Sequence, residues 1–270
     1  MDKQSKRRLQ SGNIMPIIGL GTWQLKNDTE DTVAYALNNG YILIDTSSDY
    51  GTQPGVGQGI RKSKKKRSDI YLTTKVEETD DAYKRTLSNL KELKMDYVDL
   101  MLIHRPPSSG AGENLWEGLI KAKSEGLVRD IGVSNYAPEL IDRLIEVSGE
   151  VPVVNQIEWS PFGYSEKMSE YCKNKDIIIQ AYSPLTRNQR LDDPLLKEIG
   201  DKYEKSPAQI LLRWSIQSGA CPIPKANSKK HIDENIDIFD FQLSSTDIES
   251  LDNLNEKFST FDSPLPYITE

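Results

Sequence analysis

Short runs of aliphatic and β-branched residues alternate along the chain with amphipathic stretches, in which apolar residues recur every three or four positions. The runs are almost continuously apolar, as expected for parallel strands that are buried on both faces. We predict strands at 17–20, 41–45, 70–74, 97–103, 128–133, 153–157, 177–181 and 220–223. Strands that alternate with helices in this way indicate an α/β fold, the (β/α)8 TIM barrel, with a doubly wound open sheet as the alternative.

Local signals mark several boundaries of the helices between these runs. Pro138 and Pro207 stand where a first helical residue is expected, with Ser206 as an N-cap. Gly40 and Gly126 follow expected helix ends. One expected helix has an apolar face made of Tyr83, Leu87, Leu90 and Leu93.

Elements are also predicted outside the barrel. At the N-terminus, residues 8–9 should pair with 14–15 in a β-hairpin around the turn at 11–13. At the other end we expect an extra C-terminal helix at 247–257 and a tail that contains Pro264 and Pro266. Because no linker or internal repeat interrupts the pattern, we expect residues 1–270 to form a single barrel domain.

The composition narrows the function. The chain has 34 Lys and Arg against 41 Asp and Glu, a net charge of −7, so nucleic acid is not an expected partner. No apolar stretch approaches about 18 residues, and the first residues lack a signal-peptide core, so we expect a cytoplasmic protein without membrane contact. Cys172 and Cys221 lie in no motif, which argues against a disulfide framework. With His104 and His231 as the two histidines, we expect no metal site.

Polar residues stand where the predicted strands end, which is where barrels of this kind carry their active sites. Asp45, Lys75, His104 and Ser134 follow four consecutive strands at intervals of about 30 residues. Tyr50 comes shortly after Asp45. Asn135 follows Ser134, and later strands end in Gln156, Tyr182, Ser183 and Lys225. Each residue alone has an ordinary structural explanation, but together at one barrel mouth they predict a functional site.

The types of these side chains suit proton transfer to an oxygen that is gaining negative charge. A tyrosine has an ordinary pKa of about 10, and we expect the Lys75 ammonium to lower the pKa of Tyr50. Asp45 would keep Lys75 charged and oriented. A neutral His104 could donate a hydrogen bond to a substrate oxygen. Carbonyl reduction is such a reaction, and it needs a hydride source.

The same residues and their surroundings resemble the aldo-keto reductase superfamily. The matching stretches are 19–23 (GLGTW), 44–46 (IDT), 49–51 (DYG), 73–75 (TTK), 102–104 (LIH), 132–136 (GVSNY), 154–158 (VNQIE), 181–185 (AYSPL), 207–214 (PAQILLRW) and 223–225 (IPK). They extend over nearly the whole chain. In length, the chain is most similar to short bacterial members such as diketogluconate and methylglyoxal reductases.

The resemblance implies a barrel that binds NADPH, with NADH as an alternative cofactor, and reduces aldehydes or activated ketones. By the family pattern, the catalytic residues are Asp45, Tyr50, Lys75 and His104, with Tyr50 as proton donor. The residues implied in cofactor binding are Thr22, Ser134, Asn135, Gln156, Tyr182, Ser183, Leu185, Lys225, His231, Glu234 and Asn235. The residues implied in substrate binding are Trp23, His104 and Arg105. A monomer or weak dimer that acts on a small carbonyl compound is expected.

The sequence departs from the family pattern near the cofactor and near the mouth. The family often has serine after the cofactor lysine and arginine six residues after it, whereas this chain has Ala226 and His231. We therefore expect weaker discrimination against NADH than is usual in the family. The residue after the catalytic histidine is often tryptophan, and here it is Arg105, which could attract a carboxylated substrate or pair with a nearby acid.

Other signals and functions were weighed against this interpretation. The glycines of 55–59 lack the spacing of a dinucleotide loop and are typical here of a helix start. The basic run 61–67 is interpreted as a solvated connection on the barrel face away from the site. Two alternatives stay open: a class I aldolase-like barrel that uses Lys75 as a Schiff base, and a relative that binds the cofactor without catalysis.

Overall fold

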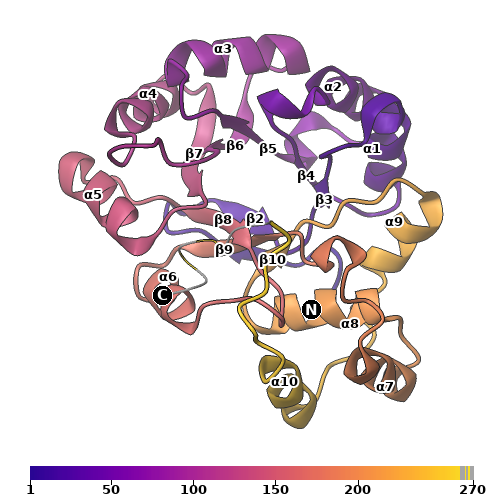
Figure 1. Ribbon diagram of the computed structural model, residues 1–270. Coiled ribbons are helices and arrows are strands. Elements are labelled where there is room, and N and C mark those ends of the chain that lie inside the picture. Colours follow the sequence, from indigo (N-terminus) through magenta and orange to yellow (C-terminus); the bar gives the residue numbers. More distant parts are fainter. Residues whose placement is uncertain (262–264, 266, 268–270) are drawn as a thin grey trace.

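The computed structural model describes residues 1–261, 265 and 267, and within them eight parallel strands form one curved sheet surrounded by helices (Figure 1). The strands follow one another in chain order: β3 (Leu20–Gly21), β4 (Leu43–Asp45), β5 (Tyr71–Val76), β6 (Val98–Ile103), β7 (Val128–Ser134), β8 (Val154–Glu158), β9 (Ile178–Tyr182) and β10 (Cys221–Pro222). The predicted α/β barrel is confirmed.

Backbone contacts join the first and last strands of this sheet. The Gly19 N–H donates to the Pro222 carbonyl at 3.0 Å, and the Gly21 N–H donates to the Pro224 carbonyl at 3.1 Å. A parallel bridge pairs Gly21 with Lys225. The sheet therefore closes on itself, which leaves no open edge to pair with another chain.

An antiparallel hairpin precedes the barrel, as predicted, but it begins two residues earlier. Its strands are β1 (Lys6–Arg8) and β2 (Ile14–Pro16), with Arg8 opposite Ile14. Met15 and Leu9 are buried in the same cluster as apolar residues of the barrel strands. The hairpin therefore covers the N-terminal end of the barrel interior, opposite the end where the strands' polar residues emerge.

Helices pack around the outside of the strands (Figure 1). They are α1 (Thr29–Asn38), α2 (Gln53–Lys62), α3 (Ala82–Leu93), α4 (Glu113–Ser124), α5 (Pro138–Ser148), α6 (Glu166–Asn174), α7 (Pro194–Tyr203), α8 (Pro207–Gln217), α9 (Lys229–Ile236) and α10 (Ser245–Asp252). The predicted caps hold: Pro138 and Pro207 open α5 and α8, and Ser206 forms a capping box with Gln209. None of the described helices is long and apolar enough to cross a membrane.

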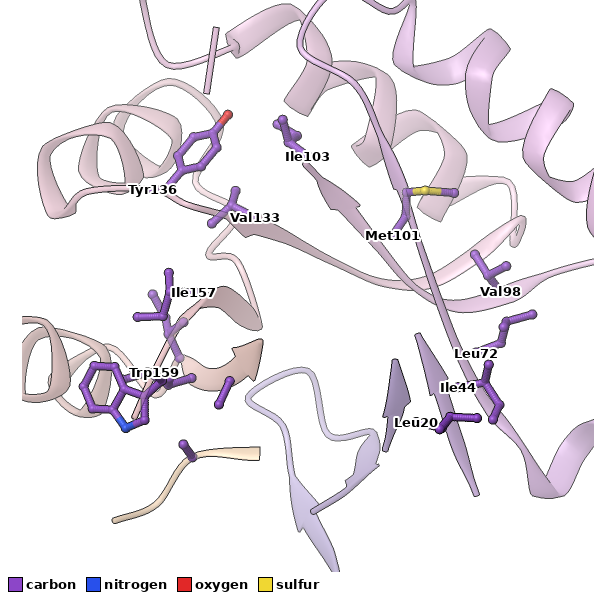
Figure 2. Packing of buried hydrophobic residues seen from close by; sticks show 14 of the residues in the cluster. Leu20, Ile44, Leu72, Val98, Met101, Ile103, Val133, Tyr136, Ile157 and Trp159 are labelled. Carbon is purple, nitrogen blue, oxygen red and sulfur yellow. The ribbon is translucent and has the colours of Figure 1, made fainter. Parts of the chain in front are cut away.

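The alternation of side chains along each strand separates two apolar clusters. Leu20, Ile44 and Leu72 are register partners on three neighbouring strands and face the helices (Figure 2). Residues of the other parity fill the barrel interior, among them Leu43, Tyr71, Leu100, Leu102, Val154 and Cys221. The polar residues at the strand ends point to the same side of their strands as these interior residues. Their side chains therefore lie at the C-terminal end of the barrel interior.

Three details of the predicted elements are wrong. The first strand begins only at Leu20, and Ile17 and Ile18 before it pack against α8. The extra helix ends at Asp252, because the residues after it bind a turn: the N–H groups of Glu256 and Phe258 both donate to the Phe162 carbonyl. The tail prolines, Pro264 and Pro266, lie outside the described residues.

The third error concerns the buried face of α3. Leu90 and Leu93 are buried as expected, but Leu87 is 43% exposed. Thr86 and Asn89 occupy the buried face instead, where the Asn89 amide donates to the Lys75 carbonyl at 2.8 Å. Polar residues are buried there because they satisfy backbone groups beneath the site.

The glycine-rich segment 55–59 lies within α2, as predicted. A Cβ atom on Gly57 would lie 2.0 Å from the Leu93 carbonyl oxygen, and one on Gly59 would lie 2.7 Å from that of Glu30. The glycines therefore permit α2 to pack closely against its neighbours. The basic run connects α2 to β5, and Arg67 donates to the Ile70 and Tyr97 carbonyls near the N-terminal ends of β5 and β6.

Candidate active site

The four predicted catalytic residues come together at the C-terminal end of the barrel. Asp45 ends β4, Lys75 lies near the end of β5 and His104 directly follows β6. Tyr50 closes a short 3-10 helix, Ser48–Tyr50, and Gly51 after it adopts a left-handed conformation with φ of 67°. Glycine permits that turn, which brings the Tyr50 side chain back over the barrel mouth.

Lys75 is the centre of the group. Its Nζ donates to Asp45 Oδ1 and to the Thr46 carbonyl, both at 2.8 Å, and to the Tyr50 hydroxyl oxygen at 3.3 Å. Lys75 has no exposed surface. Burial alone would lower the pKa of Lys75, but the charge of Asp45 raises the pKa overall, so the side chain is an ammonium at neutral pH.

The environment of Tyr50 changes one expectation. Burial raises the pKa of Tyr50 to about 12, and the positive charge of Lys75 offsets this only in part. Lys75 thus acts in the expected direction, but the effect of burial, which the sequence does not show, outweighs it. Since Lys75 donates to the phenol oxygen, the Tyr50 O–H remains free to donate to another group. Tyr50 is thus a protonated donor at neutral pH.

His104 meets Tyr50 edge to face, with 5.7 Å between the ring centroids. Its Nδ1 lies 2.8 Å from Glu77 Oε1 and 3.6 Å from Asp49 Oδ1. Asp49, Glu77 and His104 are the one set of histidine and acidic side chains, within the described chain, whose ligand atoms approach closely enough to share a metal ion. Nδ1 of His104 and the Glu77 carboxylate lie within hydrogen-bonding distance, so these two side chains form a hydrogen bond.

A cavity of about 530 Å³ opens beside these residues. It brings together most of the predicted site, and the residues that line it include Trp23, Asp45, Tyr50, His104, Arg105, Ser134, Asn135, Gln156, Tyr182, Ser183, Leu185 and Lys225. Lys75 lies beneath it, in contact with Tyr50. The cavity is therefore lined both by the proton-donating group and by Lys225.

Amide side chains in the cavity wall are fixed by a hydrogen-bond network. Gln156 Nε2 donates to Asp45 Oδ2 at 2.7 Å and to Gln180 Oε1 at 2.6 Å. Asn135 Nδ2 donates to the His104 carbonyl at 3.0 Å, and Asn135 Oδ1 accepts from the Tyr182 hydroxyl at 2.7 Å. The network ties the predicted cofactor residues to the catalytic group and gives them defined orientations.

Four predicted cofactor residues lie apart from the cavity wall. Thr22 is fully buried, and its hydroxyl donates to the Asp45 carbonyl at 2.9 Å. His231, Glu234 and Asn235 lie on α9, which begins after the Ser228 cap. His231 is exposed and Asn235 is buried, while Glu234 accepts a hydrogen bond from Ser206. Their role in cofactor binding stays a prediction.

The mouth of the cavity carries two arginines. The Arg187 guanidinium lies 4.7 Å from the centre of the Trp23 ring and 4.6 Å from that of Phe261, so it stacks between two aromatic side chains. Arg105 is half exposed and lies 3.8 Å from Asp49 Oδ2, a long and exposed contact. Both guanidinium groups therefore remain available to an anionic group at the mouth.

Sequence analysis missed several residues that the structure places at the site. Glu77 contacts His104, Gln180 holds Gln156, and Arg187 lines the mouth. The Tyr267 hydroxyl lies 3.1 Å from Asn135 Oδ1 and 3.1 Å from the Tyr182 hydroxyl. The position of Glu77, two residues after Lys75 at the end of a strand, was the one signal available, because residues just past a barrel strand face the site.

Residues 17–256 match the family model described as "Aldo/keto reductase family". The chain belongs to the aldo/keto reductase family. Glyoxal reductase of Bacillus subtilis (strain 168) is 39% identical over 255 residues, which cover 92% of each chain. Methylglyoxal reductase DkgA of Escherichia coli (strain K12) is 36% identical over 255 residues, 92% of this chain and 93% of its own.

A solved structure supports the assignment of this reductase fold. The aldo-keto reductase of Bombyx mori in complex with NADP has a TM-score of 0.89 and 35% sequence identity, covering 96% of this chain and 95% of its own. The predicted membership is confirmed, and with it the class of oxidoreductases and the similarity to bacterial reductases of small dicarbonyl compounds.

Proposed function

We propose that this aldo/keto reductase reduces small aldehydes or activated ketones to alcohols with NADPH, and that Tyr50 donates the proton. The observation that carries the proposal is the contact chain Asp45–Lys75–Tyr50 at the floor of the cavity. It presents a phenol O–H to the cavity and places an ammonium behind it. This arrangement favours protonation of an oxygen that becomes negatively charged.

The side chains that line the cavity are chemically suited to bind a nicotinamide cofactor. Tyr182 offers an aromatic face, and Gln156 offers an amide whose Oε1 accepts from no described residue. Ser134 and Asn135 complete this part of the wall, and the exposed Lys225 ammonium lies at the phosphate end. When bound, the reduced cofactor supplies a hydride. Thr22, Ser183, Leu185, His231, Glu234 and Asn235 are proposed to support its remaining parts.

The protein side of the reaction follows from the positions of three groups. His104 lines the cavity beside Tyr50 and can orient the carbonyl oxygen of the substrate. As that oxygen gains negative charge, the Tyr50 O–H transfers its proton to it. The phenolate that remains lies 3.3 Å from the Lys75 ammonium, which stabilises it. A buried ammonium at this distance needs no rearrangement during the reaction.

The aldolase alternative is disfavoured by the state of Lys75. A Schiff base requires a neutral amine with a free lone pair. The Lys75 ammonium instead donates to three oxygen atoms, and its raised pKa keeps it protonated. A cofactor-sensing relative without catalysis is the remaining alternative, and a measurement of turnover tests it.

The substrate is proposed to be small and polar. Trp23 and Arg105 line the mouth, with Arg187 and Phe261 beside them. Glyoxal and methylglyoxal reductases are among the relatives, which makes small dicarbonyl compounds the first candidates. The two guanidinium groups favour an aldehyde acid over an uncharged aldehyde of the same size. A monomer or weak dimer working in the cytoplasm remains our expectation.

The test is NADPH oxidation at 340 nm with methylglyoxal, an aromatic aldehyde, a keto-sugar acid and an aldehyde acid. Tyr50→Phe keeps the ring against His104 and removes the donor, so kcat should fall by about 10²-fold or more. Binding of NADPH, followed by quenching of intrinsic fluorescence, should persist in the variant. Retained turnover in Tyr50→Phe would exclude Tyr50 as donor, and wild-type binding without any turnover would favour the sensing alternative.

A further inference from the structure

The Nδ1 atom of His104 faces a carboxylate. It lies 2.8 Å from Oε1 and 3.1 Å from Oε2 of Glu77. The Ser47 hydroxyl donates to the same Oε1 at 3.2 Å, which fixes the carboxylate from a second side. Glu77 is 20% exposed at its side chain and His104 only 8%. The pair is therefore largely shielded from water at the edge of the cavity.

The carboxylate determines where the ring carries its proton. Burial works to raise the pKa of Glu77, but hydrogen bonds from His104 and Ser47 lower it overall, so Glu77 is ionised at neutral pH. An ionised carboxylate can only accept hydrogen bonds. Nδ1 must therefore be the donor of the contact, and a neutral His104 carries its single proton on Nδ1.

This tautomer has a consequence for the other ring nitrogen. In a neutral ring protonated on Nδ1, Nε2 holds a lone pair and cannot donate. No residue in the described part of the chain hydrogen-bonds Nε2. For Nε2 to donate to a carbonyl oxygen, the ring must take up a second proton and become an imidazolium.

We propose that Glu77 is a positioning residue that fixes the Nδ1–H form of His104, so that His104 orients the substrate carbonyl only as an imidazolium. The inference rests on the proposed carbonyl reduction and adds a partner to its machinery. It also revises the expectation that a neutral His104 performs this role. Reduction should then lose efficiency as pH rises and the imidazolium loses its proton.

Other charged groups face the same ring, and one of them provides a control for a substitution of Glu77. Asp49, on the short 3-10 helix, lies 3.6 Å from Nδ1 but outside hydrogen-bonding distance. Arg105 follows His104 and lies 3.8 Å from Asp49. Tyr50 meets the ring edge to face, with Lys75 behind it. Asp49→Asn therefore removes the same charge as Glu77→Gln from the same surroundings, but from a side chain that makes no hydrogen bond to the ring.

The kinetic test compares these two variants over the pH range of about 5 to 9. A glutamine at 77 can still accept from Nδ1 but has no charge, so kcat/KM at neutral pH should fall about tenfold, while the Kd for NADPH changes less than about twofold. The pH at which kcat/KM declines should move in Glu77→Gln, because a charge beside the ring is lost. Asp49→Asn should shift it much less, and Glu77→Asp should restore part of the activity. Equal shifts in Glu77→Gln and Asp49→Asn, or an unchanged profile, would overturn the proposal.

A spectroscopic readout separates this inference from the proposed function. The chain has two histidines, so one His231→Asn variant assigns the imidazole ¹⁵N resonances. In the neutral ring of His104, the proton should reside on Nδ1, and Glu77→Gln should weaken that preference. This result would hold even if no tested carbonyl were reduced. A neutral His104 that carries its proton on Nε2 would overturn the proposal, whatever the activity.

Discussion

The Lys75 ammonium lies 2.8 Å from Asp45 Oδ1, in a position with no solvent exposure for Lys75 and 2% for Asp45. Two opposite charges are thus buried together under the cavity. Such a pair contributes little net stability, but the loss of one partner leaves an uncompensated charge. The pair therefore holds Tyr50 in place, but the stability of the protein depends strongly on both Asp45 and Lys75.

Asp45→Asn should lower the free energy of unfolding by about 3–5 kcal/mol, because it leaves the Lys75 ammonium buried without a countercharge. The measurement is urea unfolding followed by circular dichroism. Adding Lys75→Met to Asp45→Asn should recover part of the loss. Asp31→Asn, which breaks the exposed Lys62–Asp31 contact of 2.6 Å, is the control and should leave the urea midpoint unchanged. A loss below about 1 kcal/mol in Asp45→Asn would contradict the prediction.

Gly57→Ala should destabilise the protein by more than about 2 kcal/mol, although alanine is the better helix former. The added Cβ would meet the Leu93 carbonyl oxygen at 2.0 Å, so α2 would have to move away from α3. Gln58→Ala, at the exposed neighbouring position of the same helix, should change stability by less than about 0.5 kcal/mol. Thermal unfolding of both variants checks this, and a Gly57→Ala protein as stable as wild type would refute the close packing.

Asp247 should make a contribution to stability that disappears in acid. Burial alone would raise the pKa of Asp247, but hydrogen bonds from Lys202, Ser244 and Tyr203 lower it to about 2. Because the unfolded value is about 4, the stabilisation is present above pH 4 and is lost as pH falls towards 2.

Asp247→Asn tests this dependence. At pH 6 the variant should be less stable than wild type by about 1 kcal/mol, after allowance for solvent screening. At pH 2.5 the difference should be much smaller, because wild-type Asp247 is then partly protonated. The measurement is urea unfolding at both pH values. A difference that does not depend on pH would show that the Asp247 charge has no special role.

Cofactor preference should be modest. Lys225 is exposed at the end of the cavity, and His231 stands on α9 where the family often has arginine. The ratio of kcat/KM for NADPH over NADH should lie below about 10³, because a bidentate partner for a 2′-phosphate is missing. Lys225→Met should lower the ratio, and His231→Arg should raise it. A wild-type ratio above about 10³ would contradict this prediction.

The strand-end residues could be predicted because two regular periods apply to them. Alternation along a strand gives Asp45 the same parity as Leu43, which lies inside the barrel, and the βα repeat then carries that position to Lys75 and His104. Similar reasoning failed for Leu87, since the apolar face of α3 is set by what packs beneath it. There, Asn89 satisfies the Lys75 carbonyl.

Hydrophobic periodicity along the chain was enough to predict the barrel and to group Asp45, Tyr50, Lys75 and His104 at one end of it, because the periodicity fixes which side of a strand a residue occupies. The partners of that group depend on contacts between segments that are distant in sequence. Glu77 and His104 come from different βα units, and nothing in their spacing aims one at the other. Burial likewise decided the raised pKa of Tyr50, because desolvation depends on the atoms that surround a side chain rather than on its neighbours in sequence.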